Sequence, residues 1–326
     1  MNGVIIIDKP AGWTSHDVVD RMRRVLGQRS VGHLGTLDPL ATGVLPLVTG
    51  SLTRLAQFYT ASEKTYEGTI RFGFATDTYD ADGEAVGQIS SANPTLDNLQ
   101  TLAAEFRGLI EQVPPPFSAK KIHGVPAYKL ARKQKEVILQ PVQIEIKEFV
   151  ITGVEADRAH FRARVPSGTY MRSIAHEMGQ RLGCGAHLES LRRTSVAEFD
   201  LAQAYTIEEI ENLRSEPQKS QICHPDRSIV SPKGKGCAVE EPAVLRSTSL
   251  ASLFIHPRQL LPQFPCVTAN EATAARIRSG RPINLPELSR ARRVKVFAGQ
   301  TELLAIATRV AGTLFHPKIV FPPDGV

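Results

Sequence analysis

The run GHLGTLDPLATGVLP, residues 32–46, constrains the fold more than any other stretch of this chain. It consists of glycine, proline, threonine and small or aliphatic side chains, with Asp38 as its one carboxylate and His33 as its one other ionisable group. Pro39 disfavours helical backbone at Asp38, so we expect a loop. Because the run is too long and too apolar for a plain hairpin turn, its leucines should press it against a hydrophobic core.

A carboxylate in such a loop needs a partner, because an unpaired buried charge costs on the order of several kcal/mol. The segment SGTYMRS, residues 167–173, offers Arg172 between a predicted strand and a predicted helix. Spacing along the chain does not show that the two side chains meet. Asp38 is therefore either the turn chemistry of an Asp-Pro pair or a functional carboxylate, and the residues alone leave both interpretations open.

The length and composition bound the answer. A chain of 326 residues suggests two domains, or one large domain with an appendage. Hydrophobic residues make up 42%, which is enough for a substantial core. Lys and Arg number 39 against 33 Asp and Glu, a formal net charge of +6. This excess permits a polyanionic partner without requiring one.

The spacing of the four cysteines argues against a metal site. Cys184, Cys223, Cys237 and Cys266 are far apart and form no C-x-x-C pair, whereas zinc ligands cluster at short spacings. Because nothing marks the chain as secreted, reduced thiols are a better interpretation than disulfides. The opening MNGVIIIDKPAGW has only a short apolar run before charge appears, which fits neither a signal peptide nor a membrane span. We expect a cytoplasmic protein that does not cross a membrane.

The hydrophobic pattern predicts strands and helices in alternation. Thr14 and Asp17 resemble a capping box that opens a helix reaching residue 26. Residues 32–46 form the loop. Strands are expected at residues 3–8, 65–74, 142–154 and 160–165, and helices at 51–60, 96–107, 127–133, 174–182 and within 186–194.

The composition changes after Leu213. Residues 215–251 hold scattered prolines, serines and glycines, which predicts a linker or disordered insertion. Beyond it, a helix in the segment 271–283 that ends at Gly280, and a hairpin at 292–310, predict a small mixed-β module. We therefore expect a first domain at residues 1–214, the linker at 215–251, and a second domain at 252–326.

Other chemistries find little support. Neither G-x-x-x-x-G-K-[ST] nor G-x-G-x-x-G is present, so a nucleotide cofactor is not indicated. No serine or cysteine stands in a nucleophile elbow that His33 and Asp38 could serve. A lone loop histidine is more often structural than catalytic.

Six ordered blocks resemble the TruB family of tRNA pseudouridine-55 synthases, from Gly3 to about Phe199. The blocks are VIIIDKPAGWTSHDVV, GHLGTLDPLATGVLP, KTYEGTIRFGFATDTYDADG, PPPFSAKKIHGVPAYKLAR, VPSGTYMRSIAHEMG and GCGAHLESLRRTSV. The tail from about residue 252 resembles the small PUA-like domain of such enzymes. The resemblance implies an α+β fold with a mixed, mainly antiparallel sheet, and isomerisation of uridine to pseudouridine without metal or cofactor.

The family motifs also imply roles. Asp38 in G-H-x-G-x-L-D-P falls on the catalytic aspartate, and Arg172 in S-G-T-Y-M-R should pair with it and hold it ionised. Tyr66 in K-T-Y should stack on the flipped uracil and move a proton late in the reaction.

Four further residues are implied around the substrate. Leu191 should line the pocket, and His33 should hold the loop nucleotide in its flipped conformation. Tyr170 and Lys9 complete the predicted substrate-binding set, with Lys9 as a support near the site.

The implied partner is the T arm of tRNA, bound by a monomer that extrudes the target base. Basic residues within 21–29, 116–135, 192–193 and 276–293 should meet RNA phosphates. Two alternatives remain: the same chemistry on another RNA, as in the related guide-RNA-dependent enzymes, and a non-catalytic RNA-binding or folding factor. The intact set of Asp38, Tyr66 and Arg172 disfavours the second.

Overall fold

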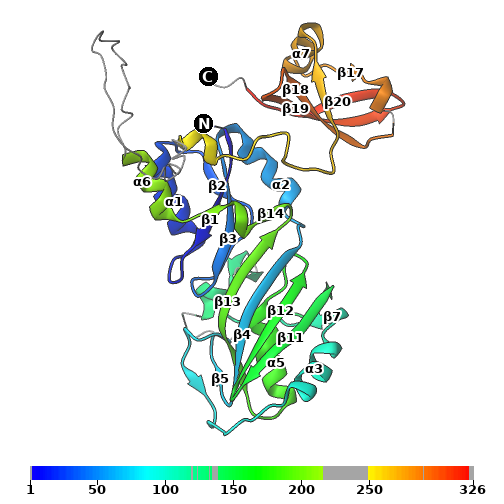
Figure 1. Cartoon of the computed structure of the whole chain (residues 1–326). Helices are drawn as coiled ribbons and strands as arrows, with labels where there is room; N and C mark the ends of the chain where they lie inside the picture. Colours follow the sequence, from blue (N-terminus) through cyan, green and yellow to red (C-terminus); the bar gives the residue numbers. More distant parts are fainter. Residues whose placement is uncertain are drawn as a thin grey trace, which may run out of the picture.

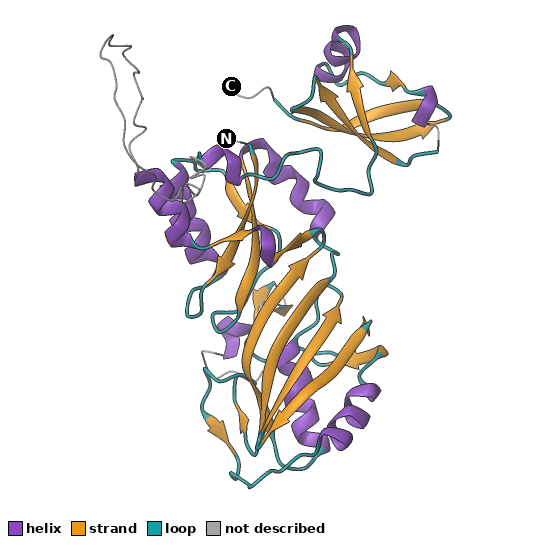
Figure 2. Ribbon diagram, in the orientation of Figure 1, coloured by secondary structure: helices purple, strands orange, loops and turns teal. Residues whose placement is uncertain are grey.

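The computed structural model describes residues 2–118, 120–122, 124–131, 133, 139–215, 249–288 and 290–322. A long sheet with helices packed beside it forms the larger part, and the last strands form a small sheet of their own at one end (Figure 1). Strands and helices are mixed along the chain (Figure 2), as predicted for an α+β protein. Among the described helices, none is both long enough and apolar enough to cross a membrane.

The large sheet runs in the order β11-β12-β4-β13-β3-β1-β15, with β14 beside β13 and β2 beside β3. Only the β13–β3 and β1–β15 pairs of this sheet are parallel among the described residues, so the prediction of a mixed, mainly antiparallel sheet is confirmed. The strands are β1 (Gly3–Lys9), β2 (Val31–His33), β3 (Thr42–Thr49), β4 (Lys64–Phe72), β11 (Glu148–Glu155), β12 (Arg158–Val165), β13 (Ala186–Val196), β14 (Phe199–Asp200) and β15 (Ala204–Tyr205).

Helices α3 and α5 cover the β4–β11 half of the sheet, and α1 packs beside β2. The Thr14–Asp17 capping box that opens α1 is confirmed, because the Thr14 side chain and the Asp17 carboxylate each accept the other's backbone N–H. The helices of this part are α1 (Ser15–Leu26), α2 (Ala56–Tyr59, preceded by the 3-10 turn Gly50–Leu55), α3 (Leu96–Glu105), α4 (Ala127–Ala131), α5 (Met171–Arg181) and α6 (Ile207–Ser215).

Short strands pair with one another outside the large sheet. They are β5 (Ala75–Thr76), β6 (Ala85–Val86), β7 (Gly108–Gln112), β8 (Lys121–Ile122), β9 (Val125–Pro126) and β10 (Val142–Ile146). The single strand predicted at 142–154 is two strands, because β10 pairs with β7 while β11 joins the large sheet.

Two further predictions of secondary structure are wrong, because strands form where a loop and a helix were expected. The predicted loop 32–46 is shorter, since its ends form β2 and β3, and only residues 34–41 lie outside strands. The helix predicted within 186–194 is β13, which lies between β4 and β3. Its leucines and arginines favour helix locally, but pairing on both sides in the sheet centre outweighs that preference.

The second sheet runs β16-β18-β19-β20-β17 and is covered by α7, which confirms the small mixed-β module. Its elements are β16 (Cys266–Ala269), α7 (Glu271–Arg278), β17 (Ile283–Asn284), β18 (Arg293–Ala298), β19 (Glu302–Ala311) and β20 (Leu314–Val320). Its Phe297, Leu303 and Ile306 share one hydrophobic cluster with Val4 and Val48 of the large sheet. Of the predicted linker, residues 216–248 lie outside the described residues.

Candidate active site

Residues 34–41, which we call the Asp38 loop, are fastened to the N-terminal strand and helix by hydrogen bonds. Ser15, at the start of α1, accepts from the Leu37 N–H at 2.8 Å and donates to the Leu37 carbonyl at 3.0 Å. The Gly12 N–H donates to the Pro39 carbonyl at 2.9 Å. Leu37 is buried in the main core, so the loop is pressed against the hydrophobic interior as the sequence predicted.

Lys9 is fully buried at the end of β1. Its ammonium donates to the carbonyls of Pro10 at 2.8 Å, Trp13 at 2.6 Å and Pro39 at 3.3 Å. Burial lowers the pKa of Lys9 to about 8, and the charge of Asp38 opposes that shift. Lys9 thus holds the Asp38 loop from the protein interior. It is not among the residues that line the open cleft beside Asp38. This position fits a supporting residue and not one in direct contact with substrate.

A second buried cation, Arg193, holds the same loop from β13. Its guanidinium donates to three carbonyls, those of Gly35 at 3.0 Å, Thr36 at 3.1 Å and Val44 at 2.8 Å. It also forms a hydrogen bond with the Tyr66 hydroxyl. The prediction that Arg193 meets RNA phosphates is wrong, because its side chain is fully buried and donates to these carbonyls and to Tyr66. One guanidinium therefore links the Asp38 loop to Tyr66.

The structure brings Asp38 and Arg172 together, although 134 positions separate them. An Arg172 nitrogen lies 2.9 Å from an Asp38 carboxylate oxygen, with the arginine side chain 6% exposed and the aspartate 41% exposed. Arg172 is the second residue of α5, and Tyr170 is the N-cap of that helix. The carboxylate thus faces open space on one side and a buried cation on the other.

Arg172 is itself held in place by groups that the sequence did not predict. It donates to the carbonyls of Thr78 at 3.2 Å and Phe117 at 3.1 Å. A second carboxylate, Asp80, lies 3.5 Å from its other terminal nitrogen. Burial raises the pKa of Asp80, against the hydrogen bond from Thr78 and the charge of Arg172. The acidic turn TDTYDADG is visible in the sequence, but nothing in it shows which aspartate reaches Arg172.

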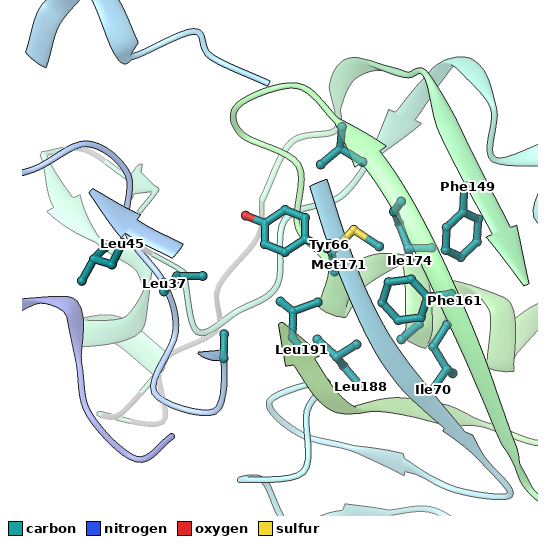
Figure 3. Packing of buried hydrophobic residues seen from close by; sticks show 14 of the residues in the cluster. Leu37, Leu45, Tyr66, Ile70, Phe149, Phe161, Met171, Ile174, Leu188 and Leu191 are labelled. Atoms are coloured by element: carbon teal, nitrogen blue, oxygen red, sulfur yellow. The ribbon is translucent and has the colours of Figure 1, made fainter. Parts of the chain in front are cut away.

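Asp38 and Arg172 border a cleft of about 490 Å³. Tyr66 on β4 and Leu191 on β13 lie next to each other and face Leu37 across a gap (Figure 3). His33 and Tyr170 also line the cleft, so six of the seven predicted site residues share it, with Lys9 the exception. Burial lowers the pKa of His33 and raises that of Tyr170, so both side chains are uncharged at neutral pH. The cleft thus combines one ion pair with an aromatic and aliphatic wall.

Among the described residues, no three His, Cys, Asp or Glu side chains gather as a metal site would require. Cys184 and Cys266 carry free thiols, while Cys223 and Cys237 lie outside the described residues. Among the residues that the structure describes, the cleft offers the paired carboxylate Asp38, the hydroxyl of Tyr66 and the cation of Arg172.

Comparison with known proteins identifies the fold and the family. The profile of the TruB family pseudouridylate synthase N-terminal domain matches residues 23–171, and that of the tRNA pseudouridylate synthase B C-terminal domain matches residues 172–230. The tRNA pseudouridine synthase B of Solibacter usitatus is 45% identical over 98% of this chain and 100% of its own length. The protein of the same name from Opitutus terrae is 47% identical over 65% of this chain and 88% of its own.

Solved structures agree on the fold. A chain in the crystal structure of a Cbf5-Nop10-Gar1 complex superposes with a TM-score of 0.68 at 22% identity, covering 98% of this chain and 85% of that one. A chain in an H/ACA RNP bound to a substrate RNA gives a TM-score of 0.65 at 21% identity, covering 99% and 86%. At this identity the likeness supports the fold alone.

The matching family models and the fold are those of a pseudouridine synthase. The family expected from the sequence blocks is confirmed by a relative that matches this chain from end to end. The chain belongs to the TruB family of pseudouridylate synthases. It is accordingly an enzyme of the isomerase class.

Proposed function

We propose that this protein converts uridine-55 in the T loop of tRNA to pseudouridine. The observation that carries the proposal is the Asp38–Arg172 ion pair at 2.9 Å on the border of a cleft walled by Tyr66 and Leu191. The relatives from Solibacter usitatus and Opitutus terrae, both named tRNA pseudouridine synthase B, support tRNA as the substrate.

The proposed reaction breaks the N1–C1′ bond, turns the base and joins C5 to C1′. C5 loses a proton and N1 gains one, so the product is an isomer and no co-substrate is consumed. Asp38 is the proposed catalytic residue, acting on the sugar or the base while the ion pair with Arg172 orients its carboxylate. Asp38 is 41% exposed, so a nucleotide that enters the cleft would have to displace water from this carboxylate before it reacts.

Tyr66 is the proposed second participant. Its ring offers a face on which uracil can stack, and its hydroxyl accepts a hydrogen bond from Arg193, which leaves the phenolic proton free to point into the cleft. Leu191 supplies apolar contact beside that ring, and His33 and Tyr170 border the same space. Extrusion of the base costs about a few kcal/mol, which stacking in this cleft offsets.

The charge distribution supports an RNA-binding role for the C-terminal module. Residues 1–251 hold 29 Lys and Arg against 29 Asp and Glu, whereas residues 252–326 hold 10 against 4. The whole net charge of +6 therefore lies in the last 75 residues, as expected for a module that meets phosphates. We propose a catalytic domain at residues 1–214 and an RNA-binding module at 252–326, in a cytoplasmic monomer.

An isolated T-arm hairpin tests this function. The purified protein should form pseudouridine at the target position in EDTA and without added nucleotide, while the DNA version of the hairpin should not react, because the 2′-hydroxyl and the looped base are what such a site reads. Mapping pseudouridine in total tRNA from cells that lack the gene should show loss at position 55 alone. Retention of that modification, with loss in another RNA, would refute the proposed substrate.

A further inference from the structure

Lys64, the first residue of β4, is a buried cation that no proposed role has yet used. It stands two positions before Tyr66 on the same strand, so both side chains lie on one face of the sheet and both line the cleft. Only 9% of the residue is exposed. A lysine so deep in an RNA-binding cleft needs a physical explanation.

The Lys64 ammonium is incompletely satisfied. It donates to the Ser62 carbonyl at 3.0 Å, and no carboxylate lies within 4 Å of it among the described residues. An ammonium has three N–H donors, so two remain for a group that enters the cleft. Burial, followed by the charge of Arg193, lowers the pKa of Lys64 to about 8, as expected of a cation that lacks a counter-ion.

The Asp38 loop brings its backbone close to this cation. A Cβ added at Gly35 would lie 3.4 Å from Lys64 Cε and 3.6 Å from an Arg193 nitrogen, and the Gly35 φ of +138° disfavours any other residue. The two cations are therefore neighbours on one side of the loop. The donors of Arg193 are occupied by carbonyls and by Tyr66, so Lys64 is the member of the pair that faces the cleft.

The charges that line the cleft do not balance. Among the described residues that line the cleft, one carboxylate, Asp38, stands against two basic side chains, Lys64 and Arg172, and Asp38 forms an ion pair with Arg172. Lys64 leaves one positive charge over. A phosphodiester carries one negative charge and presents two free oxygens, whereas uracil is neutral, so the backbone of the RNA is the better match.

We propose that Lys64 forms an anion subsite inside the cleft that binds one backbone phosphate next to the target uridine. This inference rests on the proposed function, since it requires RNA in the cleft. The subsite would fix the flipped nucleotide by its backbone while Tyr66 and Leu191 hold the base. It differs from the basic surfaces because it acts at one phosphate, at the point of reaction.

The first test compares Lys64→Met and Lys64→Arg with Lys147→Met. Lys147 is half-exposed and pairs with Glu63, so its replacement also removes one positive charge, but at a position outside the cleft. Lys64→Met should raise KM by about tenfold to hundredfold, the range expected for loss of a charge-assisted hydrogen bond. It should also reduce the slope of log affinity against log salt by about 1, as expected for the loss of one phosphate contact. Lys64→Arg should recover much of the loss, and Lys147→Met should change neither.

The second test neutralises the phosphates one at a time. A methylphosphonate at each linkage flanking the target uridine should weaken wild-type binding at one position by about the factor that Lys64→Met causes. At that position it should cause no further loss in the Lys64→Met protein. If the losses from the methylphosphonate and from Lys64→Met were additive at every linkage, the subsite would be overturned. A fall in kcat in Lys64→Met, with KM and salt dependence unchanged, would also overturn it, because the charge would then act on the reacting base.

The two proposals fail separately. If the wild-type protein bound the unmodified hairpin without converting it, the proposed function would be overturned. Binding would still show whether the losses from the methylphosphonate and from Lys64→Met are additive. Conversion of the hairpin with additive losses would overturn the subsite alone.

Discussion

Replacement of Arg193 by lysine tests how the Asp38 loop is held. Lysine keeps the charge but concentrates its donors at one point, whereas the guanidinium spreads them over a plane that reaches three carbonyls and a hydroxyl. A lysine ammonium at this depth leaves about two of the carbonyls without a donor. Each such group costs about 1–3 kcal/mol, so Arg193→Lys should lower the free energy of unfolding by about 2–6 kcal/mol.

That loss is a large share of the roughly 5–15 kcal/mol by which proteins are stable. Urea unfolding followed by circular dichroism should therefore show a lower midpoint at an unchanged slope. Turnover should fall by about a hundredfold, because a shift of about 1 Å in a catalytic group has an effect of that order.

Arg192→Lys is the matched control, one position away. Arg192 is half-exposed and pairs with Asp8 at 2.7 Å, so its replacement should change stability by less than about 1 kcal/mol. If Arg193→Lys unfolded within about 1 kcal/mol of the wild type and kept its turnover, the proposed role of these carbonyl contacts would be refuted.

Three other perturbations follow from the site and the charge distribution. Asp38→Asn should abolish pseudouridine formation while RNA affinity stays within a few-fold, and turnover near that of the wild type in the purified variant would exclude Asp38 as the catalytic group. Arg172→Lys should cut turnover strongly with little change in binding, since the geometry toward Asp38 is lost but the charge is kept; a fully active variant would make that pair unimportant. Replacing the exposed Arg281, Arg290 and Arg292 together by glutamine should make RNA binding less salt-dependent at unchanged kcat, and an unaltered salt slope would mean that this surface does not touch RNA. These substitutions are a better test than deletion of residues 252–326, which would expose the cluster that the module shares with β1 and β3.

Local sequence predicted much of the framework. The capping box at Thr14, the buried strand that begins at Gly3 and the non-helical backbone before Pro39 depend on neighbouring residues, and each is present in the structure. The family blocks likewise placed Asp38, Tyr66 and Arg172 in one site. A motif preserves an order of residue types along the chain, which is why it could name residues that the fold brings to one cleft.

Contacts between distant residues could not be predicted in this way. Residues 186–194 carry good helix formers, yet they form the strand between β4 and β3, because hydrogen bonds on both sides outweigh local preference. Once β13 is a strand, its alternation turns Arg193 inward and leaves Arg192 at the surface. The sequence shows only two adjacent arginines, which were both expected to meet RNA.

The sequence by itself determined the apolar loop, its single carboxylate and the family of the enzyme. Tertiary structure alone decided the pairings that no motif implied: Arg172 with Asp80, and Lys64 with no carboxylate among the described residues. The physical reason is that a charge is stabilised by what lies within a few ångströms, and chain folding, which brings residues from far apart together, sets those distances.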